Sequence, residues 1–325
     1  MLSYVLRRLA IGIGVLFVAS IMVFILVAES GNPLANLLQN PLVKRSTIRE
    51  RAHELYLDKP LWDRYWIWIT HALHGNFGRD YNGTPVGPQL QARMLVTLRM
   101  VVLATVISVF LAIAVGLITA LRRGKAADQG FTIMNFVFLA APVFVVGLIL
   151  KEFVAVPIDQ ATGNNTIPTL GASNPADNGG FWQNIPDYAI HMALPTLTLI
   201  LASYASWAIY QRSTLLDVMD SDYVRFARAK GISPRRVLLR HTLRNALIPI
   251  TTVVALDFAA ILGGAVITET VYGWDGLGRW YLNGVFNQDI NVILAYLLFT
   301  ASLVILFNLF ADIIYGFLDP RIRYE

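Results

Sequence analysis

The sequence contains no cysteine, and only 14% of its 325 residues are charged. The missing thiols exclude disulfides, thiol catalysis and cysteine-based zinc or iron–sulfur sites. Soluble domains carry about 25% charged residues, so a chain that is 56% hydrophobic is expected to cross a membrane several times. The net charge of +5 does not indicate nucleic-acid binding, because the basic residues gather in loops between apolar runs.

The chain also lacks a phosphate-binding loop. Gly124-Lys125 has neither the upstream glycine spacing nor the following hydroxyl residue of that motif. If ATP drives this protein, another chain must therefore hydrolyse it. No Ser-His-Asp or paired-carboxylate arrangement stands out, which disfavours a membrane-embedded enzyme. We expect the chain itself to bind no cofactor and no metal, since His191 alone among the histidines lies near an apolar run.

Six apolar runs reach the length of about 20 residues that a bilayer span requires. The first exceeds the apolar region of a signal peptide, which is about 7–15 residues long, and is predicted to be an uncleaved membrane helix. The sequence thus predicts an all-α polytopic membrane protein with six transmembrane helices. The runs are Leu9–Ala28, Leu95–Leu121, Phe131–Pro157, Ala189–Tyr210, Leu247–Tyr272 and Val292–Phe317.

The distribution of basic residues predicts which side of the cell membrane each loop faces. Lys and Arg follow the second, fourth and sixth runs, with Arg321 and Arg323 after the last, whereas 158–191 has none. By the positive-inside rule, both termini are expected in the cytoplasm. The basic segment 29–94 is still expected outside, because the rule loses force in loops longer than about 60 residues.

This topology divides the chain into a first helix with its N-terminus (1–28), an extracytoplasmic helical segment (29–94) and a core of five spans (95–325). In the outer segment, an amphipathic helix at the membrane–water interface is predicted, where Trp and Tyr concentrate. Its apolar face is formed by Trp62, Tyr65, Trp66, Ile69 and Leu73, with Trp68 added. In the core, small residues recur at every fourth position of the second span, a pattern typical of close helix packing. They are Ala104, Ser108, Ala112, Gly116 and Ala120.

A basic loop at about 213–246 lies between the fourth and fifth spans. Each Arg or Lys at a bilayer centre costs roughly 2.5–3.5 kcal/mol, so a loop this rich in arginine must lie in water. Ser221 is placed to cap a first helix, Gly231 fits the left-handed position that ends it, and Ser233-Pro234 can start a second. The pattern predicts a helix, a glycine elbow and another helix that dock on a partner. The same pattern also suits an ordinary solvated loop.

The loop resembles the cytoplasmic coupling motif of permease subunits of ABC importers. Gly231 takes the glycine position and Ala227 that of the last alanine, while Arg225 and Phe226 replace the usual glutamate and first alanine. That variant, with Ala227–Gly231 reading Ala-Arg-Ala-Lys-Gly, is typical of the dipeptide, oligopeptide and nickel permease branch. The similarity to this branch runs essentially from end to end. Its other stretches are Tyr4–Arg8, Leu57–Trp62, Gly75–Arg79, Gly264–Arg279 and Ala311–Arg323.

The resemblance implies the translocation subunit of an ATP-driven importer of short peptides. It implies four kinds of partner: the lipid bilayer, a second similar permease, two subunits that bind ATP with Mg inside, and a substrate-binding protein outside. The same machine for nickel or glutathione is one alternative. A self-sufficient secondary transporter or channel is another, which would leave the elbow without a role. The residues implied to couple to the ATPase are Arg225, Phe226, Ala227, Ala229, Lys230, Gly231, Ile232 and Ser233.

Other candidate residues lie in or near the spans. Asp257 is the deepest ionisable group, about two and a half turns into the fifth span, and intramembrane carboxylates are functional candidates by default. It could face the pathway and meet a cationic group of a peptide, or it could be hydrogen-bonded to a neighbouring helix. Candidate contacts for the binding protein are Glu269, Trp274, Trp62 and Trp66.

Overall fold

The computed structural model describes residues 2–35, 38, 42–163, 166–174 and 182–318. Their regular structure is helical, apart from an isolated β-bridge between Arg79 and Pro85. The all-α prediction is confirmed. Arg321 and Arg323, used above for the topology, lie outside the described residues, as does the end of the stretch Ala311–Arg323.

Within these residues, five helical stretches are long and apolar enough to cross a membrane, and each contains the body of a predicted span. The fifth predicted span extends further toward the N-terminus than expected, because α11 (Pro234–Arg236) and a π-helical segment η2 (Val237–Leu243) run directly into α12. The helices that carry the five stretches are α1 (Leu2–Glu29), α5 (Val86–Leu121), α9 (Ile185–Met219), α12 (Arg244–Val271) and α14 (Ile290–Leu318).

The predicted third span is a bent pair of helices rather than one continuous helix. α6 (Ala126–Ala140) is followed by a turn of 107° and by a second arm that covers Val143–Thr162. That arm consists of α7 (Val143–Leu150), the π-helical η1 (Lys151–Ala155) and α8 (Val156–Thr162). The break has a local cause: Pro142 disfavours the helical conformation of the residue before it, and Ala141 is extended with ψ 124°. The chain has six spans if the pair crosses as one.

The chain forms two compact units, and the larger consists of residues 1–6, 98–274 and 306–325. In this unit α9 contacts α6, α7 and α12. The small-residue stripe on α5 is buried along its whole length, which confirms the packing prediction. A Cβ added at Gly116 would lie 2.9 Å from the Gln211 side chain, so glycine is required there for α5 to approach α9.

The second unit consists of residues 7–97 and 275–305. It contains most of α1, α3 (Arg45–Glu54), α4 (Leu61–Leu73), α13 (Leu277–Phe286) and the first half of α14. In its core, α4 packs against α1 and α14. The Tyr65 hydroxyl of α4 lies 2.9 Å from Ser20 Oγ of α1. The buried members of that core are Phe24, Val27, Tyr65, Trp68, Ala72 and Leu294.

The structure divides the predicted apolar face of α4 between two surroundings. Tyr65, Trp68 and Ala72 pack into the core, whereas Trp62 and Trp66 are more than half exposed and Leu73 is exposed as well. Aromatic and aliphatic residues occupy most sides of this short helix, so periodicity alone did not distinguish the face that packs on α1 from the face that is left open.

The connection between α13 and α14 holds the 80–84 turn through a buried carboxylate. Asp289 accepts hydrogen bonds from the backbone N–H groups of Tyr81 at 2.5 Å and Val292 at 3.2 Å. Burial raises the pKa of Asp289, and these two hydrogen bonds oppose that change by stabilising the ionised form. The carboxylate thus fixes an otherwise irregular segment against the start of a membrane helix.

Candidate functional site: a basic elbow between two membrane helices

The basic loop folds as the sequence predicted. α10 (Asp222–Ala229) is followed by Lys230 as its C-cap and then by Gly231. The φ of Gly231 is 76°, in the left-handed region that favours glycine. The N–H groups of Gly231 and Ile232 donate to the carbonyls of Arg228 at 2.9 Å and Ala227 at 3.4 Å, which is the paired pattern of a Schellman motif. Ser233 then stands at the N-cap position of α11, with Pro234 as its first residue. We call residues 222–236 the basic elbow.

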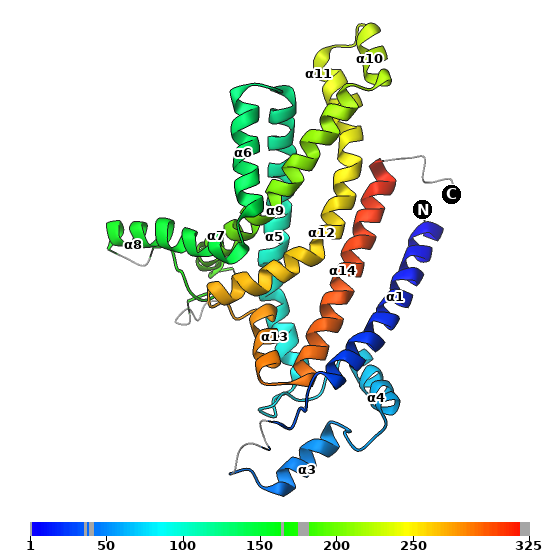
Figure 1. Ribbon diagram of the computed structural model, residues 1–325, viewed down its shortest axis with the longest axis vertical. Helices are drawn as coiled ribbons and strands as arrows, with labels where there is room; N and C mark the ends of the chain where they lie inside the picture. The colour runs from blue at the N-terminus through cyan, green and yellow to red at the C-terminus, as the bar shows by residue number, and fades with distance from the viewer. Residues whose placement is uncertain (1, 36–37, 39–41, 164–165, 175–181, 319–325) are drawn as a thin grey trace. The chain divides into compact units, whose positions relative to one another are not determined.

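The inner side of the basic elbow is apolar and fixes it to the membrane helices. Val224 and Ala227 are buried together with Val237, the first residue of η2, and Ile232 packs against them from the position after the left-handed glycine. Val218, from the end of α9, completes this cluster. The elbow is thus attached rigidly at the adjoining ends of α9 and α12, where Figure 1 shows α10 and α11. Ala227, predicted as a coupling residue, faces this cluster and offers no surface to a partner.

The outer side of the basic elbow combines aromatic and basic side chains. Phe226 is 69% exposed and Tyr223, three residues earlier on the same helical face, is 44% exposed. Arg225, Ala229 and Lys230 are exposed beside them. Exposed aromatic side chains in a setting of arginine and lysine are typical of interface anchors. The sequence prediction missed Tyr223, although its spacing from Phe226 places both on one face.

A buried ion pair connects α9 to α6 within the larger unit. Arg212 binds Asp128 in a bidentate manner, with Nε 2.7 Å from Oδ1 and one terminal nitrogen 2.8 Å from Oδ2. Oδ2 also accepts the N–H of Gly124 at 2.9 Å. Asp128 lies in the first turn of α6, where the helix dipole favours a negative charge. Sequence reasoning missed this pair, since the two residues are 84 positions apart.

Asp257 is held by a neighbouring helix. Its Oδ2 accepts a hydrogen bond of 2.8 Å from Nε1 of Trp207, which lies on α9. A nearby cavity of about 590 Å³ between α5, α12 and the last part of α14 is apolar, and Asp257 is not among its described lining residues. The contact with Trp207 favours the alternative in which Asp257 is bonded to the bundle.

The four candidate contacts for a binding protein separate into two kinds. Glu269 and Trp274 are fully buried, so neither side chain offers surface to a partner unless this part of the chain rearranges. Trp62 and Trp66 are 56% and 53% exposed on α4. Within the described part of the chain, no three His, Asp or Glu side chains come together as metal ligands would.

Comparison with known proteins places this geometry among membrane transport subunits. Residues 112–324 match the family model described as the binding-protein-dependent transport system inner membrane component. The chain is 38% identical over 324 residues to the oligopeptide transport system permease protein OppB of Mycobacterium tuberculosis strain H37Rv, which covers 99% of each chain. It is 34% identical over 326 residues to the glutathione transport system permease protein GsiC of Escherichia coli strain K12, which covers all of both.

A solved structure shows a similar fold. A chain of the MetNI methionine ABC transporter in inward-facing conformations aligns with a TM-score of 0.53 and 18% identity, over 71% of this chain and 96% of that one. At this level of identity the likeness concerns the arrangement of helices alone.

Proposed function

This chain belongs to the family of binding-protein-dependent transport system inner membrane components, and we propose that it forms part of the translocation pathway of an ATP-driven importer of short peptides. The relatives named above transport oligopeptides and glutathione, and glutathione is itself a tripeptide. A short peptide is therefore the cargo class that both relatives support. Nickel, the other alternative, would favour converging imidazoles, and the described residues contain no such group.

The basic elbow is the observation that carries this proposal. Its inner cluster joins it to α9 and α12, and its outer side exposes Phe226 and Tyr223 among basic residues. A partner that binds this surface can therefore move α9 and α12 together as rigid helices. We assign the partner role to separate ATP-binding subunits, which would supply ATP and Mg and whose docking surface should be acidic and apolar.

The remaining partners and the orientation follow from the same assignment. The elbow and both termini face the cytoplasm of a cell whose inner membrane holds the chain, and a second permease completes the pathway. An extracytoplasmic substrate-binding protein docks on the opposite side. Trp62 and Trp66 are the candidates for that contact, since they are exposed on α4.

Reconstitution tests the proposal directly. The chain, a second permease and the ATP-binding subunits are co-expressed, purified together and placed in liposomes with the binding protein outside. We expect uptake of a labelled tripeptide that requires both ATP inside and the binding protein. Uptake by this chain in the absence of ATPase subunits would instead support a secondary transporter or channel.

Replacement of Asp257 with asparagine tests its part in the pathway. Because Asp257 accepts a hydrogen bond from Trp207, the amide oxygen of the introduced side chain preserves that contact and the substitution removes only the charge. If the carboxylate binds a cationic group of the peptide, uptake of lysine-containing peptides should fall about tenfold, the loss of about 1.4 kcal/mol, while neutral peptides are unaffected. Equal uptake of both peptides would assign Asp257 to structure.

A further inference from the structure

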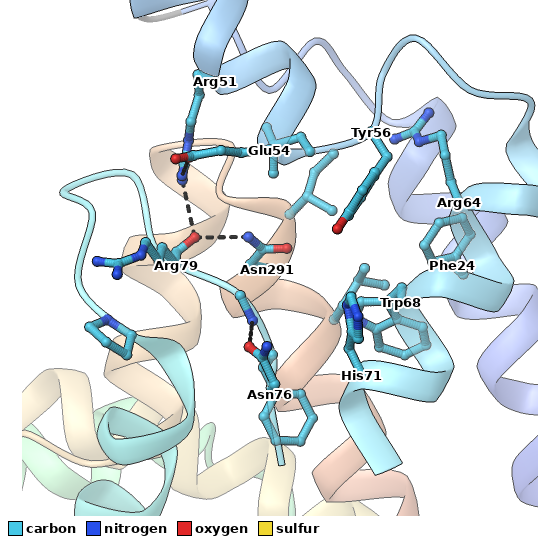
Figure 2. A pocket seen from close by; sticks show the side chains of 16 residues that line it. Phe24, Arg51, Glu54, Tyr56, Arg64, Trp68, His71, Asn76, Arg79 and Asn291 are labelled. Carbon is cyan, nitrogen blue, oxygen red and sulfur yellow. Dashed lines mark hydrogen bonds and ion pairs between the residues drawn. The ribbon is translucent and has the colours of Figure 1, made fainter. Parts of the chain in front are cut away.

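A cavity of about 430 Å³ lies within the unit formed by residues 7–97 and 275–305. Its walls come from α1, the end of α3, α4, the 76–85 segment and the start of α14, and Figure 2 shows the side chains that line it. Two membrane-spanning helices reach it: Phe24 lies near the C-terminal end of α1, and Leu294 lies near the N-terminal end of α14. The cavity therefore lies where the ends of two spans meet the membrane surface.

Its charged lining is mostly basic. The described lining residues whose side chains can carry a charge near neutral pH are Arg51, Arg64, Arg79, His71 and Glu54. Glu54 is bound by Arg51 at 2.8 Å, and Arg51 also donates to the carbonyls of Arg79 at 3.0 Å and Asp80 at 2.6 Å. Arg79 donates to the carbonyl of Gly83 at 2.8 Å. Two of the arginines thus hold the wall together.

Arg64, unlike Arg51 and Arg79, does not bond to the cavity wall in the described part of the chain. Its side chain makes no hydrogen bond or ion pair there, and its Nε is buried. Burial lowers the pKa of the Arg64 guanidinium, and the more distant charge of Glu29 acts in the opposite direction. A half-buried cation without a hydrogen-bonding partner is unfavourable, so a bound anion would stabilise this arrangement.

Two further donors line the same space. Trp68 is 9% exposed, and its indole Nε1 has no hydrogen-bond acceptor among the described residues. Tyr56 has a φ of 54° at the position that ends α3, where the backbone favours glycine, and its hydroxyl points into the cavity in Figure 2. This conformation belongs to a Schellman motif, because the N–H groups of Tyr56 and Leu57 donate to the carbonyls of His53 at 3.0 Å and Ala52 at 2.9 Å, and the motif fixes the direction of the Tyr56 side chain.

The rest of the lining is apolar and includes Phe24, Phe77 and Leu294. We infer that the cavity binds the phosphate group of an anionic phospholipid, with Arg64, Tyr56 and Trp68 as donors and an acyl chain against the apolar wall. Phosphate oxygens are hydrogen-bond acceptors, and all three side chains have N–H or O–H groups that can donate to them. Inorganic phosphate has the same oxygens, but it would leave the apolar wall in contact with water. This site is independent of the transported cargo.

Native mass spectrometry of the full-length chain in detergent tests the site. The probes are dioctanoyl phosphatidylglycerol, which has phosphate and tails, dioctanoylglycerol, which has the tails alone, and inorganic phosphate as a competitor. We expect tighter binding of the phosphatidylglycerol than of dioctanoylglycerol. Arg64→Gln should raise its apparent Kd about tenfold, which corresponds to about 1.4 kcal/mol. Tyr56→Phe should raise it by a smaller factor and serves as the test if Arg64→Gln does not fold.

The matched control is Arg49→Gln, which removes the same charge from an exposed residue of α3 that does not line the cavity. Its affinity should equal that of the unmodified chain. Equal effects of the Arg49 and Arg64 substitutions, or equal binding of dioctanoylglycerol, would overturn the inference. Full displacement by equimolar inorganic phosphate would identify free phosphate as the ligand, and Arg64-dependent binding of an acidic peptide without lipid binding would identify a protein partner.

Discussion

Substitution of Gly231 by valine is expected to reduce ATP-driven uptake by the proposed importer at least tenfold, while the chain still inserts and co-purifies with a second permease. A β-branched residue at φ 76° is strained by roughly 1–2 kcal/mol or more, which disfavours the Schellman turn that ends α10. Apart from its chain neighbours, no described residue has an atom within 4 Å of an added Cβ, so the defect comes from the changed turn and from the proposed partner surface. The measurements are uptake and ATP hydrolysis in proteoliposomes, where hydrolysis should no longer respond to the binding protein.

Gly163→Val is the matched control for this experiment. Gly163 also has a left-handed φ, of 67°, and an added Cβ there would meet no described atom within 4 Å, but it follows α8 and lies away from the elbow in the sequence. It imposes a similar backbone cost, so it should lower stability to a similar extent and leave coupled uptake nearly intact. Coupled transport by Gly231→Val at the level of the Gly163 variant would contradict the assigned role of the basic elbow.

Substitution of Arg212 by methionine is expected to destabilise the larger unit by about 3 kcal/mol. The change keeps most of the side-chain volume but leaves the Asp128 carboxylate, which is 6% exposed, without its bidentate partner. The estimate is at the lower end for buried pairs because Arg212 keeps 29% of its side-chain surface exposed. Thermal unfolding of the purified chain, followed by loss of monodisperse protein on size-exclusion chromatography, measures the effect.

A double variant identifies the cause of that loss. In Asp128→Asn with Arg212→Met, no uncompensated charge remains, so much of the stability lost in Arg212→Met should return. Arg123→Met is the control for charge alone, because its contact with Asp220 spans 3.7 Å between exposed side chains and should contribute little. Additive losses in the double variant would show that the ion pair does not couple α6 to α9.

The basic elbow and most spans were predictable because their determinants are local. A left-handed glycine after a short helix, a Ser-Pro start and apolar runs of bilayer length each act within a few residues, and the structure places them as expected. The inward orientation of Ala227 was not apparent, because it depends on Val237 across the turn.

What the sequence did not reveal depends on contacts between distant residues. The Arg212–Asp128 pair joins positions on different spans, and either residue alone looks like an ordinary charge near a membrane surface. The side of α4 that is buried packs against Phe24 and Leu294, which are far from α4 in the sequence. The third run was predicted as one span without its break at Pro142, since the angle after a proline depends on what the second arm packs against. Here α9 and α12 both contact α7.

The π-helical segment η2 lies between the basic elbow and α12 and affects the direction in which the elbow faces. A π turn accommodates one more residue than an α turn, and each residue of an α-helix advances the chain by about 100° around its axis. Because α11, η2 and α12 are continuous, an extra residue held in ordinary α geometry would turn Phe226 by about a quarter turn about the α12 axis, whereas the π turn absorbs most of that rotation. The wide turn therefore lets the chain carry one more residue here while Phe226 keeps its direction toward the ATP-binding subunit that we propose.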